Sequence, residues 1–140
     1  MKRICGKIAA IGAAVMMAVS MVGLDAYADD VYENNYALYI SNTGAVTNKT
    51  MFISRASSAG SVDVTYKVNS IVSGCSVSRS IKVGGYTPTN STGTYSTVGT
   101  RNVTHSNSNI KKGYKINVTM SLNPKPTGIG SAVSGKVYGA

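Results

Sequence analysis

The feature that most constrains this chain is an alternation of apolar and polar residues with a period of two, which is the period of a β-strand. In the segment YKINVTMSL, residues 114–122, every second side chain is apolar or aromatic, from Tyr114 to Leu122. The segment SVDVTYKV, residues 61–68, alternates in the same way. Five further strands are predicted at residues 36–41, 50–55, 75–83, 94–104 and 132–138.

Seven short strands with one apolar face each are typical of two antiparallel sheets packed face to face. No helical period occurs beyond the N-terminal segment, and Ser, Thr, Asn and Gly fill the connections between the predicted strands. The sequence therefore predicts an all-β fold, a single Ig-like antiparallel β-sandwich of about seven strands over residues 36–140. A small β-barrel is the alternative.

Residues 1–28 have the three parts of a secretory signal peptide. The basic start MKRICGK precedes an apolar stretch, and Ala26-Tyr27-Ala28 has the small-x-small pattern of a cleavage site. A transmembrane anchor is disfavoured because the apolar stretch is short and rich in Gly and Ala. We expect cleavage after Ala28 and a secreted, extracellular product. Residues 29–35, which contain three of the five acidic residues, are expected to form a flexible acidic leader.

The charge balance of the chain is strongly basic. It contains 14 Lys and Arg residues against five Asp and Glu residues, a net charge of +9, and Asp63 is the only carboxylate after residue 35. A positive field of this kind attracts polyanions over long range. For an exported protein, the accessible polyanions include cell-wall polymers and anionic glycans. Lysines that keep a sheet soluble and its edges unpaired would explain the same composition without any ligand.

The longest polar connection, GGYTPTNSTG at residues 84–93, is the most natural exposed platform. Tyrosines flank it, and exposed tyrosine rings can stack on sugar rings, although tyrosines at strand ends more often pack within the protein. Lysines cluster at the start of the strand predicted at residues 114–122. The predicted contact residues for an anionic polymer or glycan are Tyr86, Tyr95, Lys111, Lys112 and Lys115.

Two parts of the chain resemble a known class of protein. The segment IKKGYKINVTMSL, residues 110–122, together with the final SGKVYG, resembles the last hairpin of small secreted β-sandwich proteins of Gram-positive bacteria. The segment SGCSVSRSIKV, residues 73–83, is similar to a middle strand of those proteins. Most of them have no assigned activity, so the resemblance implies the fold and export and no particular reaction.

Cys75 is the cysteine that remains after the expected cleavage. The alternation in CSVSRSIKV places it on the apolar face with Ile81 and Val83, where a thiol behaves as a small buried hydrophobe. Arg79 has the same parity and is expected at a sheet edge or a bulge. Two alternatives for Cys75 stay open, a nucleophile paired with His105 and an intermolecular disulfide. His105 itself, in NVTHSNSN, is expected to be solvated.

The sequence lacks the residue sets that most catalytic sites require. Glycosidase chemistry needs two carboxylates, and the predicted domain offers only Asp63. Metal sites need several His, Cys, Asp or Glu ligands. No enzymatic activity, catalytic residue, metal site or cofactor is therefore predicted. Nucleic acid is not expected as a partner, because no strand interleaves aromatic and basic residues.

The leading functional hypothesis is a secreted, non-enzymatic β-sandwich that acts at the cell surface as a binding or structural module for anionic cell-wall polymers or glycans. The alternative is a secreted antimicrobial or toxin-like effector. Insertion of the mature chain into a membrane is not expected, because it contains no amphipathic helix and no long apolar stretch. A third hypothesis is a transferase or peptidase that depends on Cys75.

Overall fold

The computed structural model describes residues 33–124 and 130–139, which form eight β-strands. The strands are β1 (Asn34–Ile40), β2 (Asn48–Arg55), β3 (Ser61–Ile71), β4 (Cys75–Val83), β5 (Thr92–Tyr95), β6 (Gly99–Ser106), β7 (Lys115–Pro124) and β8 (Gly130–Gly139). This part of the chain contains no helix with the length and apolar character needed to cross a bilayer. The predicted signal peptide and residues 29–32 of the predicted leader lie outside it.

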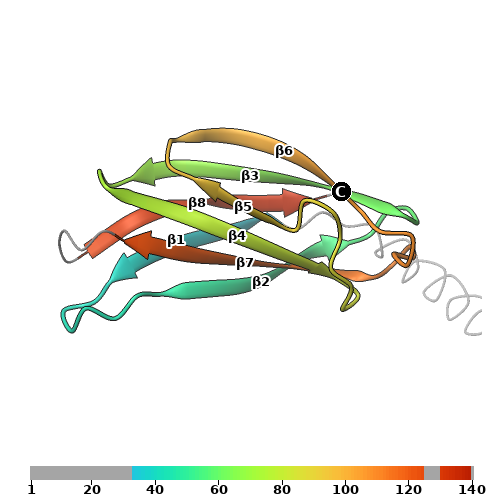
Figure 1. Ribbon diagram of the computed structural model, residues 1–140, viewed down its shortest axis with the longest axis horizontal. Coiled ribbons are helices and arrows are strands. Elements are labelled where there is room, and N and C mark those ends of the chain that lie inside the picture. The colour runs from blue at the N-terminus through green and yellow to red at the C-terminus, as the bar shows by residue number, and fades with distance from the viewer. Residues whose placement is uncertain (1–32, 125–129, 140) are drawn as a thin grey trace, which may run out of the picture.

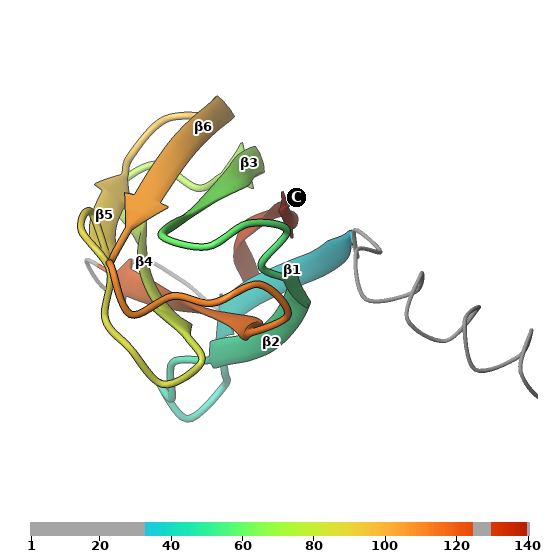
Figure 2. The same ribbon diagram turned by 90° about the vertical axis from the view of Figure 1, so that its right-hand side faces the viewer.

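The strands form two antiparallel four-stranded sheets that pack face to face, as the view along the strands in Figure 2 shows. Sheet I has the order β1-β8-β3-β6 and sheet II the order β2-β7-β4-β5. The predicted β-sandwich is therefore confirmed, and the two sheets do not close into a barrel. The chain changes sheet at every connection except the one from β4 to β5 (Figure 1). This strand order is that of an eight-stranded jelly roll and differs from the Ig-like arrangement.

The strand predicted at residues 94–104 is two strands in the structure. β5 pairs with β4 in sheet II and β6 pairs with β3 in sheet I, so residues 96–98 cross from one sheet to the other. Arg101 stabilises this crossing, because its Nη2 donates to the carbonyl oxygen and the hydroxyl of Thr97 at 3.0 and 2.8 Å. The crossing contains no Pro, Asn-Gly or Asp-Gly turn signal, which is why the sequence did not separate the two strands.

The first strand also begins earlier than predicted. Asn34 and Asn35, which the sequence assigned to the leader, pair with Val137 and Lys136 of β8. Lys136 in turn forms an ion pair with Glu33. The backbone pairing with β8 extends the sandwich by two residues at its N-terminal side.

The hydrophobic core lies between the two sheets and follows the alternation closely. Every second residue of β4 and β7 is buried, and the residues between them are exposed or half-buried. The largest fully buried apolar side chains are Leu38, Ile53, Tyr66, Ile81, Ile110, Ile116 and Met120. Cys75, the first residue of β4, is buried in the same core with a free thiol, as the apolar face of its strand predicted.

The burial of Cys75 gives a direct test of this core. A thiol reagent is expected to label Cys75 slowly in the native protein and rapidly after denaturation, measured by mass spectrometry of the Cys75 peptide. Cys75→Ser should lower the free energy of unfolding by about 1–3 kcal/mol, because it places a hydroxyl in an apolar site. Cys75→Val should be milder because the side chain stays apolar. Rapid labelling of the native protein would contradict the buried placement.

Candidate functional site

Three loops meet at one end of the sandwich, on the right in Figure 1. They are the β2–β3 loop (residues 56–60), the β4–β5 loop (residues 84–91) and the β6–β7 loop (residues 107–114). The amide of Ala56 donates to the carbonyl oxygen of Tyr114 at 2.8 Å. The side-chain amide of Asn107 donates to the carbonyl oxygen of Thr87 at 3.0 Å. These bonds join the loops into one surface, which we call the three-loop end.

Tyr86 and Tyr114 stack on each other at the three-loop end. Their ring centroids are 6.2 Å apart with an interplanar angle of 11°, and Tyr86 is 41% exposed. Tyr114 lies directly against Gly84, where φ is +57° and a Cβ atom would be 2.2 Å from the ring carbon Cδ2. Only glycine leaves room for the ring at this position. Tyr114 is therefore a fixed support behind the exposed ring of Tyr86.

Cationic residues occur in the loops and strand ends that adjoin this tyrosine pair. They are Lys111 and Lys112 in the β6–β7 loop, Lys115 at the start of β7, Lys82 near the end of β4 and Arg55 at the end of β2. Arg55 donates from Nη1 to the carbonyl oxygen of Gly113 at 3.0 Å, which ties β2 to the β6–β7 loop. Both carboxylates of the described chain lie toward this end, although not in the loops: Glu33 precedes β1 and pairs with Lys136, and Asp63 is the third residue of β3. The five cations outnumber them, so the three-loop end has an excess of positive charge.

The structure brings four of the five predicted contact residues to this end, and Tyr95 is the exception. Tyr95 lies in β5, half-buried, and its hydroxyl accepts a hydrogen bond from Nε of Arg79 at 2.5 Å. The guanidinium carbon of Arg101 lies 4.5 Å from the centroid of the Tyr95 ring. Tyr95 thus belongs to a different cluster and does not extend the surface around Tyr86.

Arg55, Lys82 and Tyr114 belong to the three-loop end but were not among the predicted contact residues. Each lies at or next to the end of a predicted strand, where alternation alone does not say which neighbours it meets. The order of the predicted strands could have indicated that these three residues lie at the same end. Consecutive antiparallel strands alternate in direction, so the end of one strand and the start of another can be assigned to the same end of a sandwich. The side-chain contacts still require the fold.

Arg79 is buried in the core, 5% exposed, and the prediction of a sheet edge or bulge is wrong. It pairs in regular register with Met120 of β7 and Gly93 of β5. A Cβ atom at Gly93 would lie 3.0 Å from Nε of Arg79, so the glycine makes room for the guanidinium group. The guanidinium carbon lies 4.6 Å from the ring centroid of Tyr66, and Nη1 donates to the carbonyl oxygen of Asn90 at 2.7 Å. Aromatic and carbonyl groups stabilise this charge.

His105 is fully buried, so the prediction of a solvated histidine is also wrong. Its Nδ1 lies 3.2 Å from the carbonyl oxygen of Thr89 and its Nε2 lies 2.9 Å from the hydroxyl of Tyr66. Because a carbonyl oxygen only accepts, Nδ1 carries the proton and the Tyr66 hydroxyl donates to Nε2. Burial lowers the pKa of His105; the bond to Thr89 raises it, and the charge of Arg79 lowers it again. The imidazole is therefore neutral at pH 7.

Cys75 and His105 lie at opposite ends of the sandwich. Cys75 follows the turn between β3 and β4, whereas His105 is next to the last residue of β6, at the three-loop end. Within residues 33–124 and 130–139, no group of three or more His, Cys, Asp and Glu side chains is placed to bind a metal ion. Comparison with protein-family models, curated proteins and solved structures finds no match to this chain.

The buried, neutral state of His105 predicts a loss of stability in mild acid. The pKa of His105 is lower in the folded protein than in the unfolded chain, so the unfolded chain binds more protons as the pH falls below about 6.5. Urea unfolding at several pH values should show the free energy of unfolding decreasing between pH 7 and pH 5.5. His105→Gln, which cannot titrate, should be less stable at pH 7 but flatter over this range. An equal slope in both proteins would contradict the prediction.

Proposed function

We propose that the protein is a secreted, non-enzymatic binding module that attaches to an anionic cell-wall polymer or glycan through the three-loop end. The observation that carries this proposal is the exposed ring of Tyr86, supported from behind by Tyr114 and accompanied by cationic side chains. The sandwich by itself carries no function, because folds of this class host many unrelated activities.

The tyrosine pair suits the apolar face of a sugar ring. An aromatic ring offers a large flat contact area, and its preferred partners stack against it with an offset. Because Gly84 fixes Tyr114 and Tyr114 supports Tyr86, the contact surface is preorganised. Preorganisation reduces the conformational entropy that is lost on binding.

The cations of the three-loop end supply the attraction to a charged polymer. Lys111, Lys112 and Lys115 are exposed, and none of the three loops contains an acidic residue. A surface with an excess of positive charge raises the local concentration of a polyanion and increases its association rate. The expected export of the chain would bring this surface to polymers of the cell envelope.

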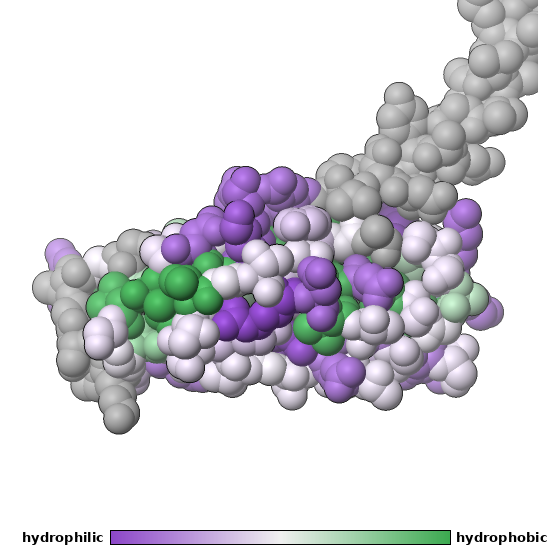
Figure 3. All heavy atoms as spheres, turned by 90° about the horizontal axis from the view of Figure 1, so that it is seen from above, coloured by the Kyte–Doolittle hydropathy of each residue, from purple (hydrophilic) through white to green (hydrophobic). Residues whose placement is uncertain are grey.

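A second candidate is an effector that acts on anionic membranes, and one observation favours it. Exposed apolar side chains occur at the end opposite the three loops: Tyr39, Val46, Val72 and Val98. Viewed from the side of β6, the largest hydrophobic patch in Figure 3 also lies toward that end. Release of dye from anionic vesicles would support the effector, and intact vesicles with retained polymer binding would support the module.

Binding to purified cell walls is expected to weaken strongly as salt rises, because the screening length falls from about 10 Å at 0.1 M to about 4 Å at 0.5 M. Co-sedimentation over this range measures the effect. The double variant Lys111→Gln and Lys115→Gln should bind less and show a weaker salt dependence. Lys67→Gln, an exposed lysine on β3 of the other sheet, is the control. Unchanged binding at 0.5 M salt would exclude an electrostatic attachment.

Tyr86→Ala is expected to weaken polymer binding about tenfold or more, as truncation of a central aromatic contact commonly does. Tyr39→Ala is the matched control, because Tyr39 is 46% exposed and lies at the opposite end of the sandwich. Thermal unfolding of both variants should show that each keeps the fold. Equal binding by the two variants would remove Tyr86 from the contact surface.

A further inference from the structure

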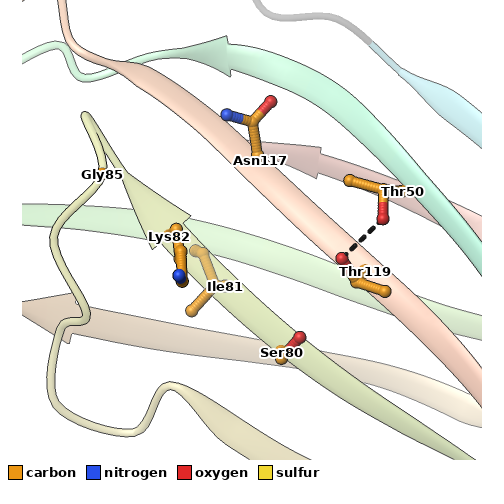
Figure 4. Close-up of a pocket in the computed structure, with 7 residues that line it drawn as sticks. All are labelled: Thr50, Ser80, Ile81, Lys82, Gly85, Asn117 and Thr119. Carbon is orange, nitrogen blue, oxygen red and sulfur yellow. Dashed lines mark hydrogen bonds between the residues drawn. The ribbon is translucent and has the colours of Figure 1, made fainter.

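A hollow of about 280 Å³ lies on the outer face of sheet II, beside the three-loop end (Figure 4). Strands β2, β4 and β7 form its floor, and the β4–β5 loop borders it. The polar and loop residues that line it are Thr50, Ser80, Lys82, Gly85, Asn117 and Thr119. Its volume is close to the lower limit of small-molecule pockets, which measure about 300–1,000 Å³.

The strand register explains why these polar groups gather there. Lys82 is opposite Asn117 and Ser80 is opposite Thr119 on the neighbouring β7 strand, while Thr50 faces Thr119 from β2. Neighbouring strands lie about 4.8 Å apart, and alternate residues along one strand lie about 6.8 Å apart. The hollow therefore presents a regular array of hydroxyl, amide and ammonium groups on one face.

Three of these groups are available for a ligand. The hydroxyl of Ser80, the ammonium group of Lys82 and the amide of Asn117 have no hydrogen-bond or ion-pair partner among residues 33–124 and 130–139. The hydroxyls of Thr50 and Thr119 bond each other at 2.7 Å, as the dashed line in Figure 4 shows. Strands β2, β4 and β7 contain no acidic residue that would compete for a bound anion.

The approach to the hollow is open at the β4–β5 loop. Apart from Gly84, Gly85 and Tyr86 themselves, no residue has an atom within 4 Å of the position that a Cβ atom of Gly85 would occupy. Gly85 lies between Gly84, which packs against Tyr114, and the exposed Tyr86. The residue that borders the hollow, Gly85, is therefore the direct chain neighbour of Tyr86 in the tyrosine pair.

We infer that this hollow is the subsite for one unit of the polymer, a sugar or polyol that carries a phosphate or carboxylate group. Lys82 binds the anionic group, and Ser80 and Asn117 bind neighbouring hydroxyl groups. The inference rests on the proposed function, because it assigns the unit of the same anionic polymer that the three-loop end attracts.

NMR titration of isotope-labelled protein tests the subsite with three small probes: glycerol 1-phosphate, glucuronate and uncharged glycerol. Amide signals of Lys82, Gly85 and Asn117 should shift with glycerol 1-phosphate or with glucuronate, and the probe that binds more tightly identifies the source of the anionic group. Glycerol should bind at least about tenfold more weakly, because a hydrogen bond to a charged group is lost. Glycerol that binds as well as both anions would overturn the inference.

Ser80→Leu fills the hollow without changing a charge and should weaken binding of the anionic probe about tenfold or more, as the loss of a well-fitted contact does. Ser76→Leu, on the same outward face of β4, is the matched control. Lys82→Gln should lower affinity more than Lys67→Gln.

If Ser80→Leu has no effect while Tyr86→Ala weakens polymer binding, the subsite is wrong and the proposed function stands. If Ser80→Leu abolishes binding of the probe, but neither Tyr86→Ala nor added salt changes binding of the polymer, the three-loop attachment is wrong.

Discussion

Burial of every second side chain between two sheets is the interaction on which this structure depends. A strand of four to eleven residues has no stability of its own, and most strands here contribute one apolar face to a shared core. The same geometry sends the remaining side chains outward, so the Ser, Thr, Asn and Lys residues form two polar outer faces. The hollow on sheet II and the loops at its end are consequences of that division, because the core leaves those side chains free for other contacts.

The buried guanidinium group of Arg79 connects the core to the candidate site. It bonds to the hydroxyl of Tyr95 on β5 and to the carbonyl oxygen of Asn90 in the β4–β5 loop, and it packs on Tyr66 of β3. A buried charge is costly unless its hydrogen-bonding groups are satisfied, so these contacts must stay in place together. Because they hold the C-terminal part of the β4–β5 loop, they help to position the loop that carries Gly85 and Tyr86.

The two ends of the sandwich differ in chemical character. The three-loop end carries the tyrosine pair and several cations, while the opposite end exposes several apolar side chains. Under the proposed function, a ligand that uses the tyrosine pair together with neighbouring cations contacts this end and the adjoining face of sheet II. An extended anionic polymer of the kind we propose could contact the loops and the hollow at the same time.

The sequence by itself determined the all-β class, the inward and outward faces of most strands and the burial of Cys75, because the two-residue period is a local property of each strand. Only the tertiary structure decided that residues 94–104 divide between two sheets and that Arg79 and His105 are buried. It also decided that Tyr114 stacks on Tyr86 and that Lys82 of β4 lies opposite Asn117 of β7. Alternation says which side of a strand a residue occupies, but not which distant residue lies opposite. A glycine such as Gly93 or Gly84 makes room for a large side chain only once strand order and loop paths bring the two together.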